Sequence, residues 1–443
     1  MNGKSFYYYI PENLELEELV KKHPPSFKFK IHKAHLFLSQ LSMLASEGKH
    51  VTRNGFVKMS SKVIQNLSIR DFPKYREWLV QVGIILFDNT YVSASFGLPL
   101  CMRYRYTDEY YSSKVKLIPV TKWSHRKNMA SIMSNLIAKN KTRLNDAFFN
   151  ENLKVDIEML KLNLLLKYED EIKAGMPLEE AKRNFNSSII NANKINQGSF
   201  YLTIDKTIGR HHSSIVELPK IVRNHLTYKG EYLTELDFSN AQLLFFTILL
   251  RPEFWKSDVN FMFPSLSDSH EKIDQQLFRY SSIRHKHSSD VEVRFDTPSI
   301  YMLAENLQTQ SMREFKRFVS LVEKGEIYEY LHYNFGLYSS RYSKQTRKEF
   351  KKSLITFTNS RINYNSEFYK LFKKEFPAIT NFLIELKKGD YRAFSHLLYY
   401  LETSVMYERI TPTLRLHRPY IVFYTIHDCI LCTESNIDFV RNV

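Results

Sequence analysis

The clearest pattern in the chain is an apolar run that is interrupted once. Residues Ile421–Ile426 are apolar enough for a buried strand, and Cys429–Cys432 form a second apolar run, with only His427 and Asp428 between them. Strand, two polar residues, strand is the pattern of a β-hairpin, so we expect Asp428 to be raised above a hydrophobic floor. A carboxylate there is costly without a metal ion or a cation as its partner. An ordinary hairpin whose turn contains an Asp is the alternative.

A second segment also ends a strand-like pattern with an acid. Residues Tyr232–Leu236 have strand character, and Asp237 ends them. Ser239 or Asn240 can then cap a helix, because both residue types are favoured at the N-cap. We expect that helix to run through the apolar residues 243–250.

These two strand ends define a candidate catalytic site. If the strands lie side by side, Asp237 and Asp428 come close together, and two close carboxylates repel unless divalent cations lie between them. That is the geometry of two-metal phosphoryl transfer. One ion activates an attacking hydroxyl, and the other holds a triphosphate and stabilises the leaving pyrophosphate.

Asp-Phe-Ser-Asn-Ala-Gln at 237–242 resembles motif A of the family A polymerases, and Ile-His-Asp at 426–428 resembles their motif C. That superfamily includes bacterial repair-type DNA polymerases and single-subunit phage and mitochondrial RNA polymerases. The resemblance covers residues 200–443 and implies an α+β fold, a right-hand polymerase-like palm of antiparallel sheet with helical fingers and thumb. It also implies that Asp237, Asp428 and the carbonyl of Phe238 bind two Mg²⁺ ions, or Mn²⁺ in their place.

A basic helix is predicted between the two motifs, over residues 341–357. Its cations recur at three- and four-residue steps and share one face; they are Lys344, Arg347, Lys348 and Lys351. The residues expected to face the core are Phe350, Leu354 and Phe357. Arg347-x-x-x-Lys351 resembles motif B of the same family, which implies that both cations bind the triphosphate. Lys352 and Gln242 are further nucleotide-binding candidates, and a solvated basic face is the alternative.

A Gly-Arg step lies just upstream of the first acid. In segment 205–214, Arg210 stands beside hydroxyl and imidazole side chains, which suits a loop that contacts backbone phosphate. The segment resembles the Gly-Arg loop near template and primer in single-subunit polymerases, which implies nucleic-acid contact by Arg210 and His212. His427 is expected to support the Asp428 turn or to touch the primer end. An ordinary polar loop is the alternative.

The sequence departs from the family at several positions. The Tyr-Gly that usually follows the motif B lysine is missing, and Gln242 and Cys429 stand where DNA polymerases usually have Glu. The choice between a DNA and an RNA product therefore stays open. Glu402 lies on the otherwise apolar stretch 396–409 and needs a partner. It either orients groups near the site or is a satisfied structural carboxylate.

Residues 31–120 show the element order of a winged helix, namely helix, strand, helix, helix and a hairpin over 84–87 and 91–93. The later helix would carry Lys74, Tyr75 and Arg76 toward a duplex, and the residues that could touch phosphate are Arg103 and Arg105. A protein–protein module is the alternative.

The pattern divides the chain into six parts. They are an irregular lead-in (1–30), a winged-helix-like domain (31–120), a helical thumb-like region (121–200), a first palm segment with motif A (201–250), an insertion with the fingers (251–395) and a second palm segment with motif C (396–443). Within the thumb-like region we expect helices over 127–141, 145–166 and 178–193.

Composition narrows the partners. The 443 residues carry a net charge of +16, which favours a polyanionic partner, most simply nucleic acid. The three cysteines, Cys101, Cys429 and Cys432, give no disulfide framework and favour a reducing compartment, so we expect a cytoplasmic protein. Cys429-x-x-Cys432 has zinc-ligand spacing without a second pair, so we interpret both as core residues. No signal peptide or membrane span is expected.

The sequence therefore predicts a nucleotidyltransferase that uses nucleoside triphosphates, with nucleic acid as template and primer. Two alternatives remain: a polymerase-derived binding protein without catalysis, and template-independent or protein-primed nucleotide addition. The compact size and the unusual N-terminal half suggest an origin in a mobile element, a phage or a defence system. Oligomeric state stays open.

Overall fold

The chain has an α+β fold with antiparallel sheets, as expected. The computed structural model describes residues 6–48, 50–89, 101–122, 124–127, 149–205, 210–238, 240–255, 297–335, 342–361 and 366–443.

The N-terminal unit follows the predicted order of helices and strands. Its elements are α2 (Ile31–Glu47), β2 (Val57–Met59), α3 (Ser61–Asn66), α4 (Phe72–Gln81), β3 (Ile85–Asp88) and β4 (Met102–Tyr106), with sheet order β2-β4-β3. Ser60 caps α3, because its hydroxyl accepts from the Val63 N–H. Strand β3 pairs with β4, which the pattern did not indicate, while the predicted partner 91–93 lies outside the described residues.

Within the described residues 6–30, the chain is not an irregular lead-in, which corrects the prediction made for residues 1–30. Tyr7–Pro11 form β1 and Leu16–Lys22 form α1. Strand β1 pairs antiparallel with β5 (Val115–Pro119), which follows α5 (Asp108–Tyr111). The partner of β1 lies far along the chain, so no local pattern could indicate the pairing.

The region expected to be purely helical also contributes a strand. Leu153–Val155 form β6, and α7 (Ile157–Lys173) begins only after Asp156, whose carboxylate accepts from the Met159 N–H. The prediction of helix from residue 145 is therefore wrong over β6, because strand pairing and an N-cap override the apolar pattern there. Helix α8 (Leu178–Asn196) is close to its predicted range, whereas most of 127–141 lies outside the described residues.

A side chain of α8 completes the outer edge of β6. The Asn196 amide accepts from the Val155 N–H at 2.7 Å and donates to the Val155 carbonyl at 3.0 Å. Lys154 donates to the Asn196 backbone carbonyl at 3.0 Å. Both polar backbone groups of Val155 at this edge are thereby satisfied.

The central sheet has five strands in the order β11-β12-β10-β9-β6. The strands not yet introduced are β9 (Leu226–Tyr228), β10 (Glu231–Asp237), β11 (Phe423–Ile426) and β12 (Cys429–Thr433). The predicted hairpin is confirmed, because β11 and β12 pair antiparallel with Ile426 opposite Cys429. Strands β7 (Leu202–Ile204) and β8 (His211–Ser213) form a separate pair, followed by the short helix α9 (Lys220–Arg223).

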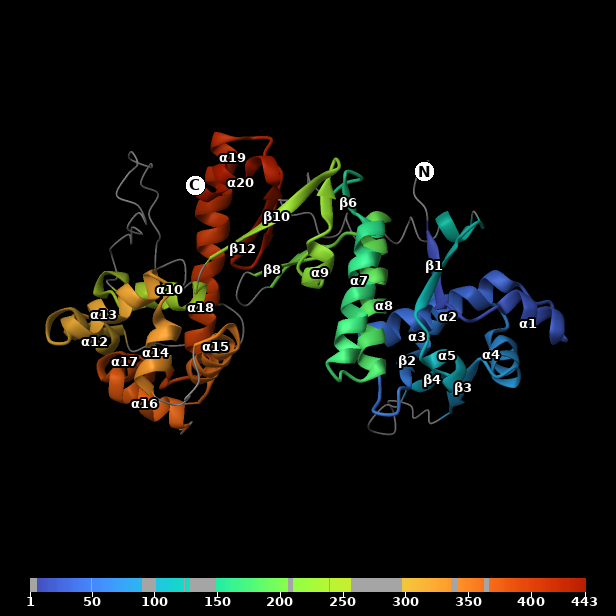
Figure 1. The fold of residues 1–443 in the computed structure, drawn as a ribbon, viewed down its shortest axis with the longest axis horizontal. Helices are drawn as coiled ribbons and strands as arrows, with labels where there is room; N and C mark the ends of the chain where they lie inside the picture. Colours follow the sequence, from blue (N-terminus) through green and yellow to red (C-terminus); the bar gives the residue numbers. More distant parts are fainter. Residues whose placement is uncertain are drawn as a thin grey trace.

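Helices build the other end of the molecule. They are α10 (Ala241–Leu249), α12 (Thr297–Thr309), α13 (Met312–Glu323), α14 (Ile327–Phe335), α15 (Lys344–Asn359), α16 (Glu367–Glu375), α17 (Pro377–Lys387) and α18 (Ala393–Ser404). A π-helix (Val405–Ile410) and α19 (Thr411–His417) continue α18, and α20 (Ile437–Asn442) follows β12. Figure 1 shows the N-terminal elements at one end and helices α12–α17 at the other, with β10 and β12 between them.

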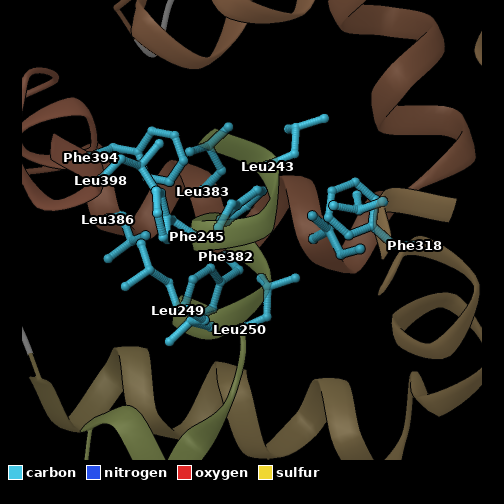
Figure 2. Packing of buried hydrophobic residues seen from close by; sticks show 14 of the residues in the cluster. Leu243, Phe245, Leu249, Leu250, Phe318, Phe382, Leu383, Leu386, Phe394 and Leu398 are labelled. Carbon is cyan, nitrogen blue, oxygen red and sulfur yellow. The ribbon is translucent and has the colours of Figure 1, made fainter. Parts of the chain in front are cut away.

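The apolar face of α10 explains how this helical end is held together. Phe245 and Leu249 of α10 lie beside Phe382 and Leu386 of α17, with Phe394 of α18 close by (Figure 2). All five side chains are buried. Burying side chains of this size stabilises the fold by roughly 1.5–3 kcal/mol each, so α10 is firmly fixed directly after Asp237.

The expectations about membrane spans and about the cysteines can be compared with the fold. Within the described residues, no helix has the length and apolarity needed to cross a bilayer. Cys429 and Cys432 are buried free thiols that belong to different hydrophobic clusters. Three residues apart on a strand, their side chains leave opposite faces, so the interpretation as core residues is confirmed.

Candidate active site at two strand ends

Strand register brings the two predicted acids together. Strands β10 and β12 pair antiparallel with Asp237 opposite Cys429, the residue after Asp428. The Phe238 N–H donates to the Asp428 carbonyl at 3.2 Å, so a backbone hydrogen bond links the segments that carry the two acids. Although the Asp237 side chain is exposed, the surrounding protein reduces its hydration, and this burial together with the Asp428 charge raises the pKa of Asp237.

Unusual backbone flanks both acids. His427 has φ of 52° in the two-residue turn before Asp428, and Asn240 has φ of 55° three residues after Asp237. Positive φ is uncommon for residues other than glycine, and such conformations cluster at functional sites. The left-handed residue lets β11 turn tightly into β12, as the primed turns of hairpins do.

The basic helix faces this acidic point. Ser343 and Thr346 form a capping box at the start of α15, and the buried residues include all three predicted ones, Phe350, Leu354 and Phe357. In the first turn of α15, an Arg347 guanidinium nitrogen lies 3.5 Å from the Asn240 side-chain oxygen. The Lys351 charge counteracts the rise in the pKa of Asp237. The fold therefore brings the Lys351 charge to Asp237 and places Arg347 beside Asn240, three residues further along the chain.

The other two nucleotide-binding candidates, Lys352 and Gln242, have no described contact with the two acids. Lys352 is exposed on α15, and Gln242 is half-buried in the first turn of α10. Among the described interactions, neither makes a hydrogen bond or ion pair with Asp237 or Asp428. Their assignment remains a prediction.

Arg210 is paired inside the protein. Its guanidinium donates to both carboxylate oxygens of Glu402, at 3.0 and 2.7 Å, and lies 3.9 Å from the ring centre of Tyr399. Glu402 is only 3% exposed, and burial raises its pKa while Arg210 opposes the rise. The partner that Glu402 required is therefore Arg210. The predicted contact of Arg210 with phosphate stays a prediction, and such a contact would have to share the guanidinium with Glu402.

Two histidines and a tyrosine lie near the Asp428 turn. The rings of His212 and His427 lie 6.2 Å apart, and burial and the Arg210 charge lower the pKa of His427 to about 4. The His211 ring stacks on Tyr407 at 3.6 Å, and the Tyr407 hydroxyl lies 2.8 Å from the Thr425 hydroxyl. Tyr407 belongs to the π-helix, an irregularity that is frequent at functional sites.

One acid near the site was missed at the sequence level. Glu235 accepts from Arg223 at 2.6 Å and lies 3.5 Å from Lys220, and its charge contributes to the raised pKa of Asp237. The Glu-x-Asp spacing was the available signal, because residues two apart on a strand share a face. Its partners, from α9, could not be inferred from that spacing.

The described residues fit magnesium better than a structural metal. In the described part of the chain, no three His, Cys, Asp or Glu side chains gather as a metal site. Mg²⁺ commonly uses one or two carboxylates and completes its shell with water and substrate phosphates. Asp237, Asp428 and the Phe238 carbonyl supply that kind of donor set, which lacks the four ligands of a structural zinc site.

The predicted contacts of the N-terminal unit are largely occupied. Lys74 is exposed on α4, but Tyr75 is 1% exposed and its hydroxyl accepts from the Lys30 N–H at 2.8 Å. The expectation that Tyr75 faces a duplex is therefore wrong, because its position on α4 points into the core. Arg76 packs over the Phe87 ring at 4.3 Å. The strand arginines each pair with an acid, in the pairs Arg103–Asp88 at 3.2 Å and Arg105–Asp108 at 2.6 Å.

Comparisons with protein-family models, curated proteins and solved structures found no significant match to this chain. The functional argument therefore depends on the geometry of the site and on the motif resemblance.

Proposed function

We propose that the chain is a nucleotidyltransferase that adds nucleotides from nucleoside triphosphates by two-metal phosphoryl transfer, with nucleic acid as template and primer. The observation that carries the proposal is the register of β10 and β12, which puts Asp237 and Asp428 at neighbouring strand ends. The charge of Lys351 acts on Asp237, and Arg347 contacts Asn240 three residues after that acid; both observations support the proposal.

Each group has a role in this proposal. Two Mg²⁺ ions, when bound, supply activation of the attacking hydroxyl and charge stabilisation of the leaving pyrophosphate. Asp237, Asp428 and the Phe238 carbonyl hold them. Lys351 and Arg347 bind the triphosphate, since preorganised cations stabilise the charge that develops during transfer. Burial keeps His427 neutral at neutral pH, so it acts as a hydrogen-bonding group beside Asp428 rather than as a cation.

The finer architecture follows from these roles. The five-stranded sheet is the palm, α15 lies in the fingers, and α7 and α8 form the thumb-like region. Because β6 belongs to the palm sheet, the thumb-like region begins only at α7. Residues 31–120 form a winged-helix-like domain, supported by the order α2-β2-α3-α4-β3-β4.

The test compares wild type with Asp428→Asn and with Asp438→Asn, a matched change at an exposed acid that pairs with Arg441. Each protein is incubated with each nucleoside triphosphate and Mg²⁺, with and without template and primer. We expect Asp428→Asn to lower turnover by more than about 10³-fold while folding normally, and Asp438→Asn to match wild type. An active Asp428→Asn variant would refute the proposal.

The same experiment separates the alternatives. Turnover only with template and primer supports templated synthesis, and preference among the triphosphates identifies the product. Turnover without template supports untemplated or protein-primed addition. Salt-sensitive binding without turnover under any condition supports the non-catalytic binding protein.

A further inference from the structure

A dense group of basic side chains lies far from the acidic strand ends, at the start of α2 and after β5. We name it the Lys122 cluster, and its members are Lys30, His32, Lys33, Lys122 and His125. The Lys122 ammonium lies 2.9 Å from the His32 imidazole, and the rings of His32 and His125 lie 4.9 Å apart. The Tyr8 hydroxyl, from β1, hydrogen-bonds to His125 at 2.8 Å. The pairing of β1 with β5 therefore assembles the cluster.

The cluster gathers cations without matching acids. Among the described residues, no carboxylate lies within ion-pair distance of Lys30, Lys33 or Lys122, and the acid whose charge acts on Lys33 is Asp71. By contrast, Lys116 on neighbouring β5 pairs with Glu15 at 2.6 Å.

The electrostatic consequence is visible at the centre of the cluster. Burial first, and then the charges of Lys122, His125, Lys30 and Lys33, lower the pKa of His32 to about 4. Like charges held this close repel one another, and an anion placed among them removes that repulsion.

We propose that the Lys122 cluster binds backbone phosphates of nucleic acid, as a contact separate from the acidic site and beyond the proposed function. Lys30 and Lys122 are exposed and can reach a phosphate, while His32 and Lys33 are half-buried and held in place. The contact lies beside α4, since Lys33 sits 5.9 Å from the Tyr75 ring, but it does not use Arg76, Arg103 or Arg105.

Nucleic acid fits this surface better than an anionic membrane. Peripheral membrane binding combines basic residues with apolar side chains that enter the bilayer. The aromatic residues next to the cluster, Phe27 and Phe29, pack against Tyr75 and Trp78 and are not free to insert. A polyanion bound by charge alone needs no such insertion.

The test uses a charge-matched pair of variants in the full chain. One carries Lys30→Gln, Lys33→Gln and Lys122→Gln. The control carries Lys21→Gln, Lys22→Gln and Lys58→Gln, three exposed lysines of the same end of the chain. Binding of fluorescent single- and double-stranded oligonucleotides is measured by anisotropy at several salt concentrations. We expect the cluster variant to bind at least about tenfold more weakly and to lose about 2–3 units of salt slope, with the control close to wild type.

Repeating the binding series in the Asp428→Asn background separates this contact from catalysis. The same loss in both backgrounds supports a separate contact, whether or not the wild-type chain shows turnover. Equal affinity and slope for cluster variant and control would overturn the proposal. Loss of binding to phosphatidylserine vesicles with unchanged oligonucleotide binding would overturn it in favour of a membrane. Melting temperatures of both variants check folding, and Lys122→Glu alone must weaken oligonucleotide binding if a triple variant fails to fold.

Discussion

Helix α15 and the N-terminal pair of α4 and β4 were both expected to present cations to phosphate, and the fold treats them differently. On α15, Arg347 and Lys351 are exposed and lie beside Asn240 and Asp237. On α4 and β4, Arg76 covers an aromatic ring, and both strand arginines pair with acids. The number of cations is similar in the two places. Those on α15 are exposed, whereas the arginines on α4 and β4 are already occupied by a ring or by acids.

The difference teaches that the position of nearby acids decides what a basic residue can do. Asp108 follows Arg105 by three residues, and Asp88 lies directly opposite Arg103 in the β3–β4 register. These acids neutralise the cations locally. Beside α15, burial and the Asp428 charge raise the pKa of Asp237 despite the Lys351 charge. Under the proposed function, these cations and acids together bind a metal–triphosphate complex.

The strongest way to break this comparison is to remove the cations at each place. Arg347→Ala combined with Lys351→Ala should lower kcat/KM for nucleotide addition by about 10³-fold, roughly 4 kcal/mol of transition-state stabilisation. Lys74→Ala combined with Arg76→Ala should change it less than about twofold on a short primer-template, because neither residue lies near the acids. Steady-state kinetics with both double variants measures this. Equal losses would mean that α15 has no special role.

The next largest effect concerns Arg210, which was predicted to contact nucleic acid but is paired with an acid like the N-terminal arginines. Glu402→Ala leaves the guanidinium of Arg210 largely buried without a carboxylate partner. The free energy of unfolding should therefore fall by about 3 kcal/mol. Asp108→Ala, which breaks the exposed pair with Arg105, should lower it by less than about 1 kcal/mol. Guanidinium unfolding of both variants measures the difference. A loss of similar size in the two would show that burial does not distinguish the pairs.

A metal titration sharpens the acidic side of the comparison. Mg²⁺ should raise the melting temperature of wild type, with about 1.4 kcal/mol of stabilisation at ten times the dissociation constant. Asp237→Asn should remove most of this shift, because one of the two carboxylates is gone. Differential scanning fluorimetry with Mg²⁺ measures the effect, with Asp438→Asn as the matched control. An unchanged shift in Asp237→Asn would place the bound ion elsewhere.

The smallest expected effect is the pH dependence that Asp237 causes. Its folded-state pKa is raised, so protonation favours the folded state; that stabilising contribution is complete below the unfolded-state pKa and is lost as pH rises through the folded-state pKa. Without divalent metal, Asp237→Asn should therefore be slightly more stable than wild type at about pH 7, with the gap closing toward about pH 4. Unfolding curves at both values measure it. A gap that widened on acidification would contradict the raised pKa.

Local patterns predicted the parts of the site that depend on local structure. The hairpin of β11 and β12, the strand that ends at Asp237 and the core face of α15 all follow from apolar spacing and turn chemistry. The pairing of β10 with β12 was a hypothesis about long-range contact, and the register confirms it. The motif resemblance grouped the strand that ends at Asp237, the basic helix and the Asp428 hairpin into one candidate site. Apolar spacing alone does not indicate that grouping.

Long-range partners account for most of what was missed. The partner of β1 is β5, the partner of β6 is β9, and the partner of Glu402 is Arg210, each far away along the chain. Sequence showed that Glu402 needed a partner without showing which one. Tyr75 was misplaced for a different reason, because a residue between two cations on a helix looks exposed until the buried face of that helix is known.

The Asn196 amide on the outer edge of β6 has a consequence for assembly. With both backbone groups of Val155 already engaged, a strand from another molecule finds no donor and acceptor to match there. Addition of a further strand at Val155 would have to displace the Asn196 amide, so this margin of the sheet is a poor template for pairing with another chain.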